Sequence, residues 1–435
     1  MTRQRQLKSL IRSRMDRTGE KYMVARRHAL NARPSSDYEL RGGNDPETSA
    51  CANAFANRGI DDPFTGQPIS EGLVLGVGGG LGAGYILWEF NATKGTDRKV
   101  VTLGFRNQWQ YPDRWYAKVC QRLGVAVQVH ETSSAAKARD LLDQALDDGI
   151  PAIAFVSTAD LPYWHLPAEQ SGWWGYPITV YGKEGDRYLV DDRNTGRLTI
   201  GADDLAAARS RIPSYKNRLV VADAAASELD EEQLVTGVRA GLEEQLAHLS
   251  EKSTSFSLPA FDKWAKMLID TKNPKSWSKV FADRVGLVEA LASVGEQVDD
   301  RGMFGGSLRR LYADFLGHAG ELIAIDLSEP ASAYVVASER WLDVAAVCRS
   351  VPAVDEACRL SRVRRDAVER GDIANDEAAK SAEGIASALG APDPIGPKEI
   401  TDLFADLSEA INAAARAERD ALETLRVAVT GREGA

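Results

Sequence analysis

The chain has 435 residues, of which 44% are hydrophobic and 27% are charged, a composition typical of a folded protein and not of a disordered or fibrous one. This length allows two or three domains that each bury a core. The net charge of −10 argues against a dedicated nucleic-acid-binding protein, and four cysteines without CxxC spacing favour a reducing cytoplasm.

The N-terminal segment, residues 1–44, is predicted to be a basic helical arm followed by a linker. Residues 1–45 contain eleven Lys or Arg and five Asp or Glu, so they carry +6 and the other 390 residues carry −16. Residues 5–31 favour a basic helix, and no apolar segment typical of a signal peptide is visible. The arm either contacts nucleic acid or an acidic partner, or folds back on the acidic body, which is the interpretation we favour.

A helix start is clearest at Asp45. Asp45 can act as the N-cap, Pro46 suits the first helical position, and Glu47 and Thr48 fall in the first turn. Gly59 is expected to end this helix.

Next comes a glycine-rich stretch, SEGLVLGVGGGLGAGYILWEF, at residues 70–90. Its uncharged run, residues 72–88 between Glu71 and Glu89, is too short for a membrane span, which needs roughly 20 apolar residues. It also lacks a complete dinucleotide fingerprint, and a loop rather than a strand precedes it. The glycines therefore indicate close packing or close approach of a backbone.

From the end of this stretch to residue 193, strand and helix patterns alternate along the chain. The patterns predict strands at 99–106, 125–132 and 151–157 and helices at 113–124 and 134–148. A hairpin with strands at 176–182 and 187–193 follows.

From about residue 227 the apolar residues recur at helical spacing and strand signals almost vanish. Examples are Leu234, Val238, Leu242 and Leu246. We therefore predict an α+β domain at 45–224 and an all-α domain at 225–435, with the boundary near 222–228.

Several segments occur in the order found in one known family. PETSACANAFANRGI is followed by SEGLVLGVGGGLGAGY, RNQWQYP, RLGV, GIPAIAFVSTADLPY, ITVYG and VDDR. This resembles the N-terminal domain of butirosin biosynthesis protein H, a papain-like fold. KSWSKVF and GGSLRRLYADFL resemble the uncharacterised helical domain that often follows it in actinobacterial proteins.

The resemblance implies a cysteine acyltransferase that moves an acyl group from a carrier protein to an amine. In the family a cysteine at the first helix is the nucleophile, a histidine is the base and an acid orients it. Here Pro46 stands at the cysteine position and Asp45 at the residue before it. Tyr176 replaces the histidine after Gly175, and only the acid matches, as Asp192.

The candidate catalytic residues are therefore Glu47, Tyr176 and Asp192, with Thr48. Each has a structural alternative: Glu47 is a favourable first-turn acid, Thr48 supports the cap, and Tyr176 fills space. Cys51 is interpreted as a small buried residue, although a register in which it is the nucleophile stays open. Candidate substrate-binding residues near the cleft are Trp109, Tyr111, Tyr163, His165, Gly78, Gly79 and Gly80.

Two functions remain open at this point. The first is a cytoplasmic protein of specialised-metabolite biosynthesis. Its altered acyltransferase cleft would bind an acyl, aminoacyl or peptidyl intermediate, either free or linked to a carrier protein. If the protein is an enzyme, acid/base chemistry would carry out cyclisation or acyl transfer there. The second is a non-catalytic scaffold that pairs with an intact paralogue or a carrier protein. We predict no cofactor, no metal because no cluster has ligand spacing, and no membrane contact; a homodimer stays open.

Overall fold

The computed structural model describes most of the chain: residues 37–90, 98–227, 229–390 and 395–431, with residues 12, 15, 21 and 22. The helix predicted at 5–31 lies almost wholly outside these residues. Among the described residues, no helix is long and apolar enough to cross a membrane.

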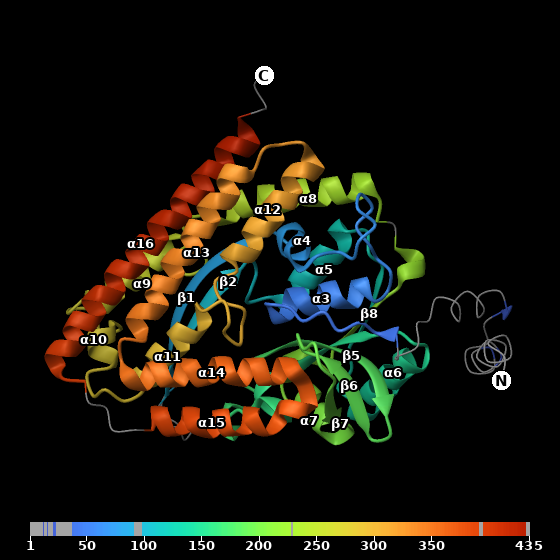
Figure 1. Cartoon of the computed structure of the whole chain (residues 1–435), viewed down its shortest axis with the longest axis horizontal. Helices are drawn as coiled ribbons and strands as arrows, with labels where there is room; N and C mark the ends of the chain where they lie inside the picture. The colour runs from blue at the N-terminus through green and yellow to red at the C-terminus, as the bar shows by residue number, and fades with distance from the viewer. Residues whose placement is uncertain are drawn as a thin grey trace.

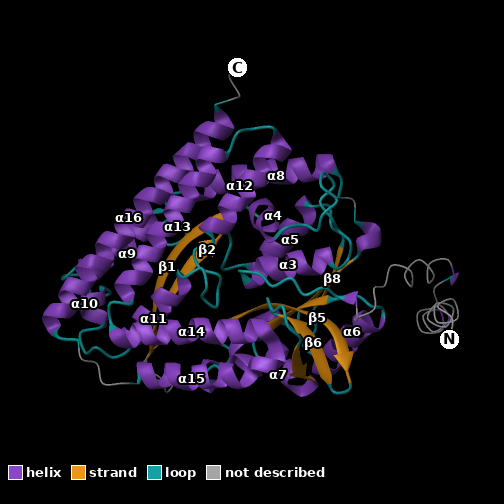
Figure 2. Cartoon of the chain, viewed as in Figure 1, coloured by secondary structure: helices purple, strands orange, loops and turns teal. Residues whose placement is uncertain are grey.

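The first part of the chain is built on one antiparallel sheet of six strands (Figure 2). Its strand order is β3-β8-β4-β5-β6-β7. The strands are β3 (Val127–His130), β4 (Ala152–Ser157), β5 (Gly175–Glu184), β6 (Arg187–Asp191), β7 (Leu198–Gly201) and β8 (Leu219–Ala222). Between β4 and β5 the chain forms short 3₁₀ turns, including η4 (Pro162–Trp164).

Helices cover both faces of this sheet because successive strand residues face opposite sides. On one face lie α3 (Pro46–Ala56) and α5 (Pro112–Arg122), and on the other α6 (Ala135–Asp147) and α7 (Ala202–Ser210). Helix α3 begins as predicted: Asp45 accepts hydrogen bonds from the backbone N–H groups of Glu47 and Thr48, and Pro46 is the first residue.

A second, two-stranded ribbon leaves this part and lies among the C-terminal helices (Figure 1). Strand β1 (Leu81–Phe90) pairs antiparallel with β2 (Arg98–Arg106). The C-terminal helices are α8 (Glu231–Leu249), α9 (Pro259–Ile269), α10 (Trp277–Val280), α11 (Leu287–Gln297), α12 (Arg309–Ile323), α13 (Ser328–Cys348), α14 (Pro352–Arg370), α15 (Asn375–Leu389) and α16 (Pro397–Thr430). The prediction of an α+β region followed by a helical region is therefore confirmed.

Sequence patterns missed five elements of the α+β region: α4, β1, β7, α7 and β8. Strands β7 and β8 have four residues each, too few for alternation to be distinctive. Strand β1 was hidden because its first residues, Leu81 to Gly84, are half glycine, which weakens any strand signal.

The glycine-rich stretch is the place where the helical region packs on the α+β region. Its first part is a short helix, α4 (Glu71–Val77), capped by Ser70, and its last part is β1. A Cβ added at Gly76 would lie 2.3 Å from the Phe315 ring of α12, and one added at Gly241 of α8 would lie 2.2 Å from the Gly76 carbonyl oxygen. The glycines therefore allow two helices of the C-terminal region to approach α4 closely.

We expect Gly241→Ala to destabilise the protein by about 1–3 kcal/mol, because the new methyl group would overlap backbone atoms that cannot rotate away. Gly317→Ala is the matched control, since Gly317 is also helical and a Cβ there would meet nothing within 4 Å. That control is expected to be neutral or stabilising by up to roughly 1 kcal/mol. Urea unfolding of both variants measures this, and equal effects would contradict the proposed close approach.

Candidate functional site

Two of the predicted catalytic residues, Tyr176 and Asp192, lie where the start of α3 approaches the ends of β5 and β6. Tyr176 is the second residue of β5, and Asp192 directly follows β6. Both are almost completely buried, with exposed fractions of 2% and 3%.

Asp192 is the centre of a buried hydrogen-bond cluster. Its Oδ2 accepts hydrogen bonds from the Tyr176 hydroxyl at 2.8 Å, the Trp164 indole N–H at 2.9 Å and the Tyr163 hydroxyl at 3.1 Å. Burial, followed by the charge of Asp192, raises the pKa of Tyr176 well above its ordinary value. The phenol therefore stays protonated at neutral pH, so it can donate a hydrogen bond but cannot act as a base.

Arg193 links this cluster to the start of α3. Its guanidinium donates to Asp192 Oδ1 from Nη2 at 3.0 Å, and its Nη1 lies 3.3 Å from the Asn44 carbonyl oxygen. Burial lowers the pKa of Arg193, but Asp192 and Tyr176 raise it more, so the net shift is upward and the side chain is a buried cation. A guanidinium thus lies between the helix start and the Tyr176–Asp192 pair.

The backbone at Arg193 is held in an uncommon conformation. Its φ is +62°, in the left-handed region that non-glycine residues rarely adopt. Two side-chain bonds fix this turn: Asp191 Oδ1 accepts from the Arg193 N–H at 3.1 Å, and Asn194 Oδ1 accepts from the Asp192 N–H at 2.7 Å. The surrounding structure therefore sets the direction of the Arg193 side chain.

The helical region covers this cluster. The Met303 carbonyl oxygen accepts from Arg193 Nη1 at 2.5 Å, and Arg365 of α14 donates to the Gly43 carbonyl oxygen at 2.9 Å. Burial, and secondarily the charge of Arg193, lowers the pKa of Arg365 to about 10. Met303 and α14 therefore lie over Arg193 and the segment before α3.

The Thr48 hydroxyl forms hydrogen bonds with nearby carboxylates. Its hydroxyl donates to Glu71 Oε1 at 2.7 Å and approaches Asp45 Oδ1 at 3.1 Å, and Glu71 also accepts from the backbone N–H groups of Asn44 and Asp45. Thr48 therefore joins the N-cap of α3 to Glu71 at the start of α4.

Glu47 points away from the Asp192 cluster, toward β2 and α5. Its Oε1 lies 3.7 Å from Arg106 Nη2, and its side chain is 17% exposed. Burial, followed by the nearby Asp45 charge, raises the pKa of Glu47 to about 7. Glu47 is thus a carboxyl group that can gain or lose a proton near neutral pH, but it lies outside the Tyr176–Asp192 cluster.

The predicted substrate-binding residues do not gather in one place. Of these residues, Tyr163 joins the Asp192 cluster, and His165 lies 3.0 Å from Asn375 at the start of α15. Trp109 packs against Phe256, while Tyr111 is 46% exposed with Arg114 over its ring. Gly78, Gly79 and Gly80 adjoin protein side chains, namely those of Trp115, Asn107, Glu244, Gln245 and Tyr312.

Sequence reasoning missed Trp164, Arg193 and Asp191. Arg193 belongs to the VDDR segment, so its position was visible although its role was not. Asp191 faces the opposite side of the sheet from Asp192, where it accepts from Tyr38 at 2.7 Å and Asn53 at 3.1 Å. Burial raises its pKa to about 7.

A comparison with protein families matches residues 45–193 to the family described as butirosin biosynthesis protein H, N-terminal. Residues 45–193, most of the α+β region, are therefore similar to this family, and the match ends on Arg193. A search of curated proteins found no match.

We expect Arg193→Met to destabilise the protein by about 3–5 kcal/mol, because the substitution leaves the Asp192 carboxylate buried without its cation. Arg340→Met is the control: Arg340 forms an exposed ion pair with Asp343, so its loss should cost less than about 1 kcal/mol. Denaturant unfolding compares the two, and similar losses would show that Arg193 does not join the two regions.

Stability should fall as pH rises from about 4.5 to about 7. Over this window the folded protein holds protons on Glu47 and Asp191 that the unfolded chain has released, so deprotonation favours unfolding. Glu47→Gln should remove part of this dependence. Between pH 5 and pH 8 the variant should therefore lose roughly 1–3 kcal/mol less unfolding free energy than the wild type. A wild-type stability that is flat over this window would contradict both raised pKa values.

Proposed function

We propose that the protein serves a biosynthetic pathway as a non-catalytic partner and not as a cysteine acyltransferase. On this proposal its α+β region keeps the family's fold, and its partner is a carrier protein or an intact paralogue.

The observation that carries this proposal is the position of Arg193. A buried guanidinium is bonded at once to Asp192, Asn44 and Met303. A nucleophile and base would need that space, and a substrate would need a path that Met303 and α14 now fill. Opening such a path would expose or separate buried charges, which costs several kcal/mol.

The cysteines support the same conclusion. Cys51 is 0% exposed within α3, and burial raises its pKa well above the ordinary value, so little reactive thiolate forms. The other three cysteines, Cys120, Cys348 and Cys358, are also buried.

Charge favours a carrier protein as the partner. Residues 1–45 carry +6, and carrier proteins usually present acidic surfaces, so association would be fast and sensitive to salt. The intermediate would arrive attached to that partner.

Glu47 supports a second candidate function, acid/base chemistry on a bound acyl or aminoacyl intermediate. Its pKa of about 7 suits proton transfer at neutral pH, and Arg106 beside it could hold an anionic group. This function would place the reaction next to β2 and α5, away from Tyr176 and Asp192.

An acyl-pantetheine thioester should leave no covalent mass on the protein, and Cys51→Ala should behave as the wild type. Intact-protein mass spectrometry measures this, with Cys120→Ala as the matched buried-cysteine control. A stoichiometric acyl adduct that Cys51→Ala alone abolishes would overturn the proposal.

The two candidate functions differ in what the protein retains. Native mass spectrometry with candidate carrier proteins should detect a stoichiometric complex that weakens as salt is raised. Turnover of a carrier-linked intermediate that Glu47→Gln abolishes, while Tyr176→Phe leaves it intact, would instead support the second function.

A further inference from the structure

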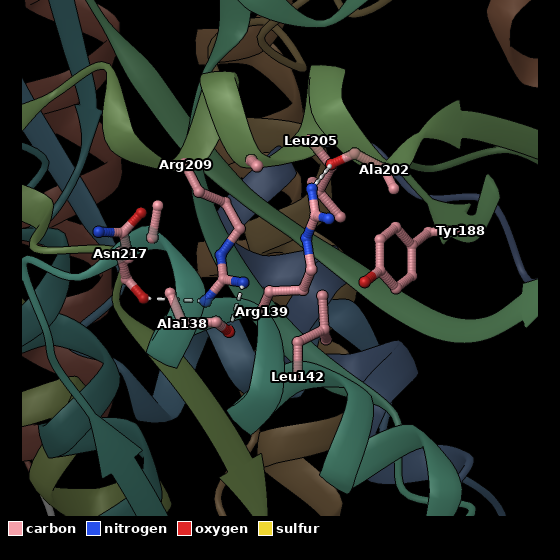
Figure 3. A pocket seen from close by; sticks show the side chains of 10 residues that line it. Ala138, Arg139, Leu142, Tyr188, Ala202, Leu205, Arg209 and Asn217 are labelled. Carbon is pink, nitrogen blue, oxygen red and sulfur yellow. Dashed lines mark hydrogen bonds between the residues drawn. The ribbon is translucent and has the colours of Figure 1, made fainter. Parts of the chain in front are cut away.

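Several basic side chains are already engaged within the protein. Arg209, between α6 and α7, is almost completely buried and donates to the carbonyl oxygens of Ala138 and Asn217, both at 3.0 Å (Figure 3). Arg139, in the same region, pairs with Asp203 at 2.8 Å. The lysines of α9, of α10 and of the loop between these helices differ, because they are exposed and unpaired.

This segment is strongly basic in an acidic chain. Residues 263–282 contain five Lys, one Asp and no Arg or Glu, so they carry +4, and the other 415 residues carry −14. Helices α9 and α10 lie at a corner of the molecule, away from the six-stranded sheet (Figure 1). All five lysines are exposed, and together they are called the lysine patch here: Lys263, Lys266, Lys272, Lys275 and Lys279.

The acids within and beside the patch are engaged by other groups. Asp262 pairs with Arg419 of α16. Asp270 Oδ1 accepts hydrogen bonds from the backbone N–H groups of Lys272 at 2.8 Å and Asn273 at 2.9 Å. Among the described residues, none of the five ammonium groups of the patch forms an ion pair or donates a hydrogen bond. The patch is therefore free to contact acids of another molecule.

The fold holds the patch in place. Lys263 and Lys266 lie one turn apart on the exposed side of α9. Trp277 anchors α10, because it is fully buried and donates its indole N–H to the Tyr85 hydroxyl at 2.8 Å. Neighbouring like charges on a helix are destabilising, so the stability of the fold does not account for the patch. A partner would meet a backbone that is already ordered, which lowers the entropic cost of binding.

An exposed apolar side chain lies within the patch. Ile269 is the last residue of α9, between Lys266 and Lys272 in the chain, and it is 55% exposed. An apolar contact with charged residues around it is typical of a protein–protein interface. An extended polyanion, such as a nucleic acid or an anionic membrane, would also face the rest of the chain with its −14. A small acidic protein can cover the patch alone.

We propose that the lysine patch, together with Ile269, is the docking surface for the acidic face of a carrier protein. This inference rests on the carrier-protein partner proposed above and adds the place where that partner binds. Opposite charges on the two surfaces would steer the approach of the carrier protein and fix its orientation. Contact with Ile269 would add apolar burial at the same place.

Charge reversal in the patch tests this docking surface. Isothermal titration calorimetry of the full chain with a purified holo acyl carrier protein should show saturable binding. Lys263→Glu combined with Lys266→Glu should weaken it at least about tenfold. Lys137→Glu combined with Lys380→Glu is the matched control, since both lysines are exposed in helices and their reversal changes the net charge equally. That control should bind within about twofold of the wild type.

The outcomes separate this inference from the proposed function. If the wild type and both double variants bind equally, the carrier protein contacts another surface, so the inference is wrong while the proposed function stands. Equal weakening by both double variants would also overturn the inference, because net charge alone would then set the affinity. If the wild type does not bind, the carrier-protein partner itself is wrong. Binding to vesicles of equal parts phosphatidylcholine and phosphatidylglycerol, without carrier binding, would assign the patch to a membrane instead.

Ile269→Ala tests the apolar part of the surface without changing any charge. It should weaken carrier binding about fivefold, whereas Val427→Ala, a change at a 61% exposed residue of α16 outside the patch, should have no effect. A thermal melt of each variant establishes that it is folded. Equal binding by both variants would show that Ile269 is not part of the docking surface.

Discussion

The packing of the helical region against the α+β region at the start of α3 depends on one buried guanidinium. Arg193 must satisfy its charge and its N–H groups away from water, and it does so with Asp192 from the α+β region, Asn44 before α3 and Met303 from the helical region. Because a buried charge tolerates few substitutes, these partners fix the entry of α3, the end of β6 and the loop before α12 relative to one another. The geometry around the family's catalytic position follows from this constraint.

A second buried ion pair, inside the helical region, also joins distant elements. Arg309 of α12 pairs with Glu418 of α16, and it also donates to the carbonyl oxygens of Gly82 in β1 and Phe105 in β2. The ribbon is thereby held inside the helical region. One hydrophobic core cluster contains residues of α3 in the α+β region and of helices up to α16 in the helical region. The two regions therefore bury one another's apolar surface.

The sequence allowed the local elements to be predicted better than their assembly. The start of α3 was predictable because Asp45 and Pro46 are local signals, and the pairing of the Tyr176 and Asp192 positions followed from the family resemblance. The covering of that pair was not predictable, because Met303 and Arg365 lie more than one hundred residues away and nothing in their local sequence indicates the contact. The direction of Glu47 also depends on tertiary neighbours, here Arg106 and Tyr116.

The glycine-rich stretch explains how a cysteine-free site and an intact fold can coexist. A Cβ at Gly76 would meet the Phe315 ring and one at Gly78 would meet the Trp115 ring, so packing alone accounts for these two glycines. Glu71, at the start of α4, meanwhile holds the backbone of Asn44 and Asp45. The shape around the start of α3 is therefore maintained by contacts with the helical region and with α4, whether or not a nucleophile is present. Because packing accounts for the shape of this region, chemistry must be sought at groups that packing does not require, such as the partly exposed Glu47.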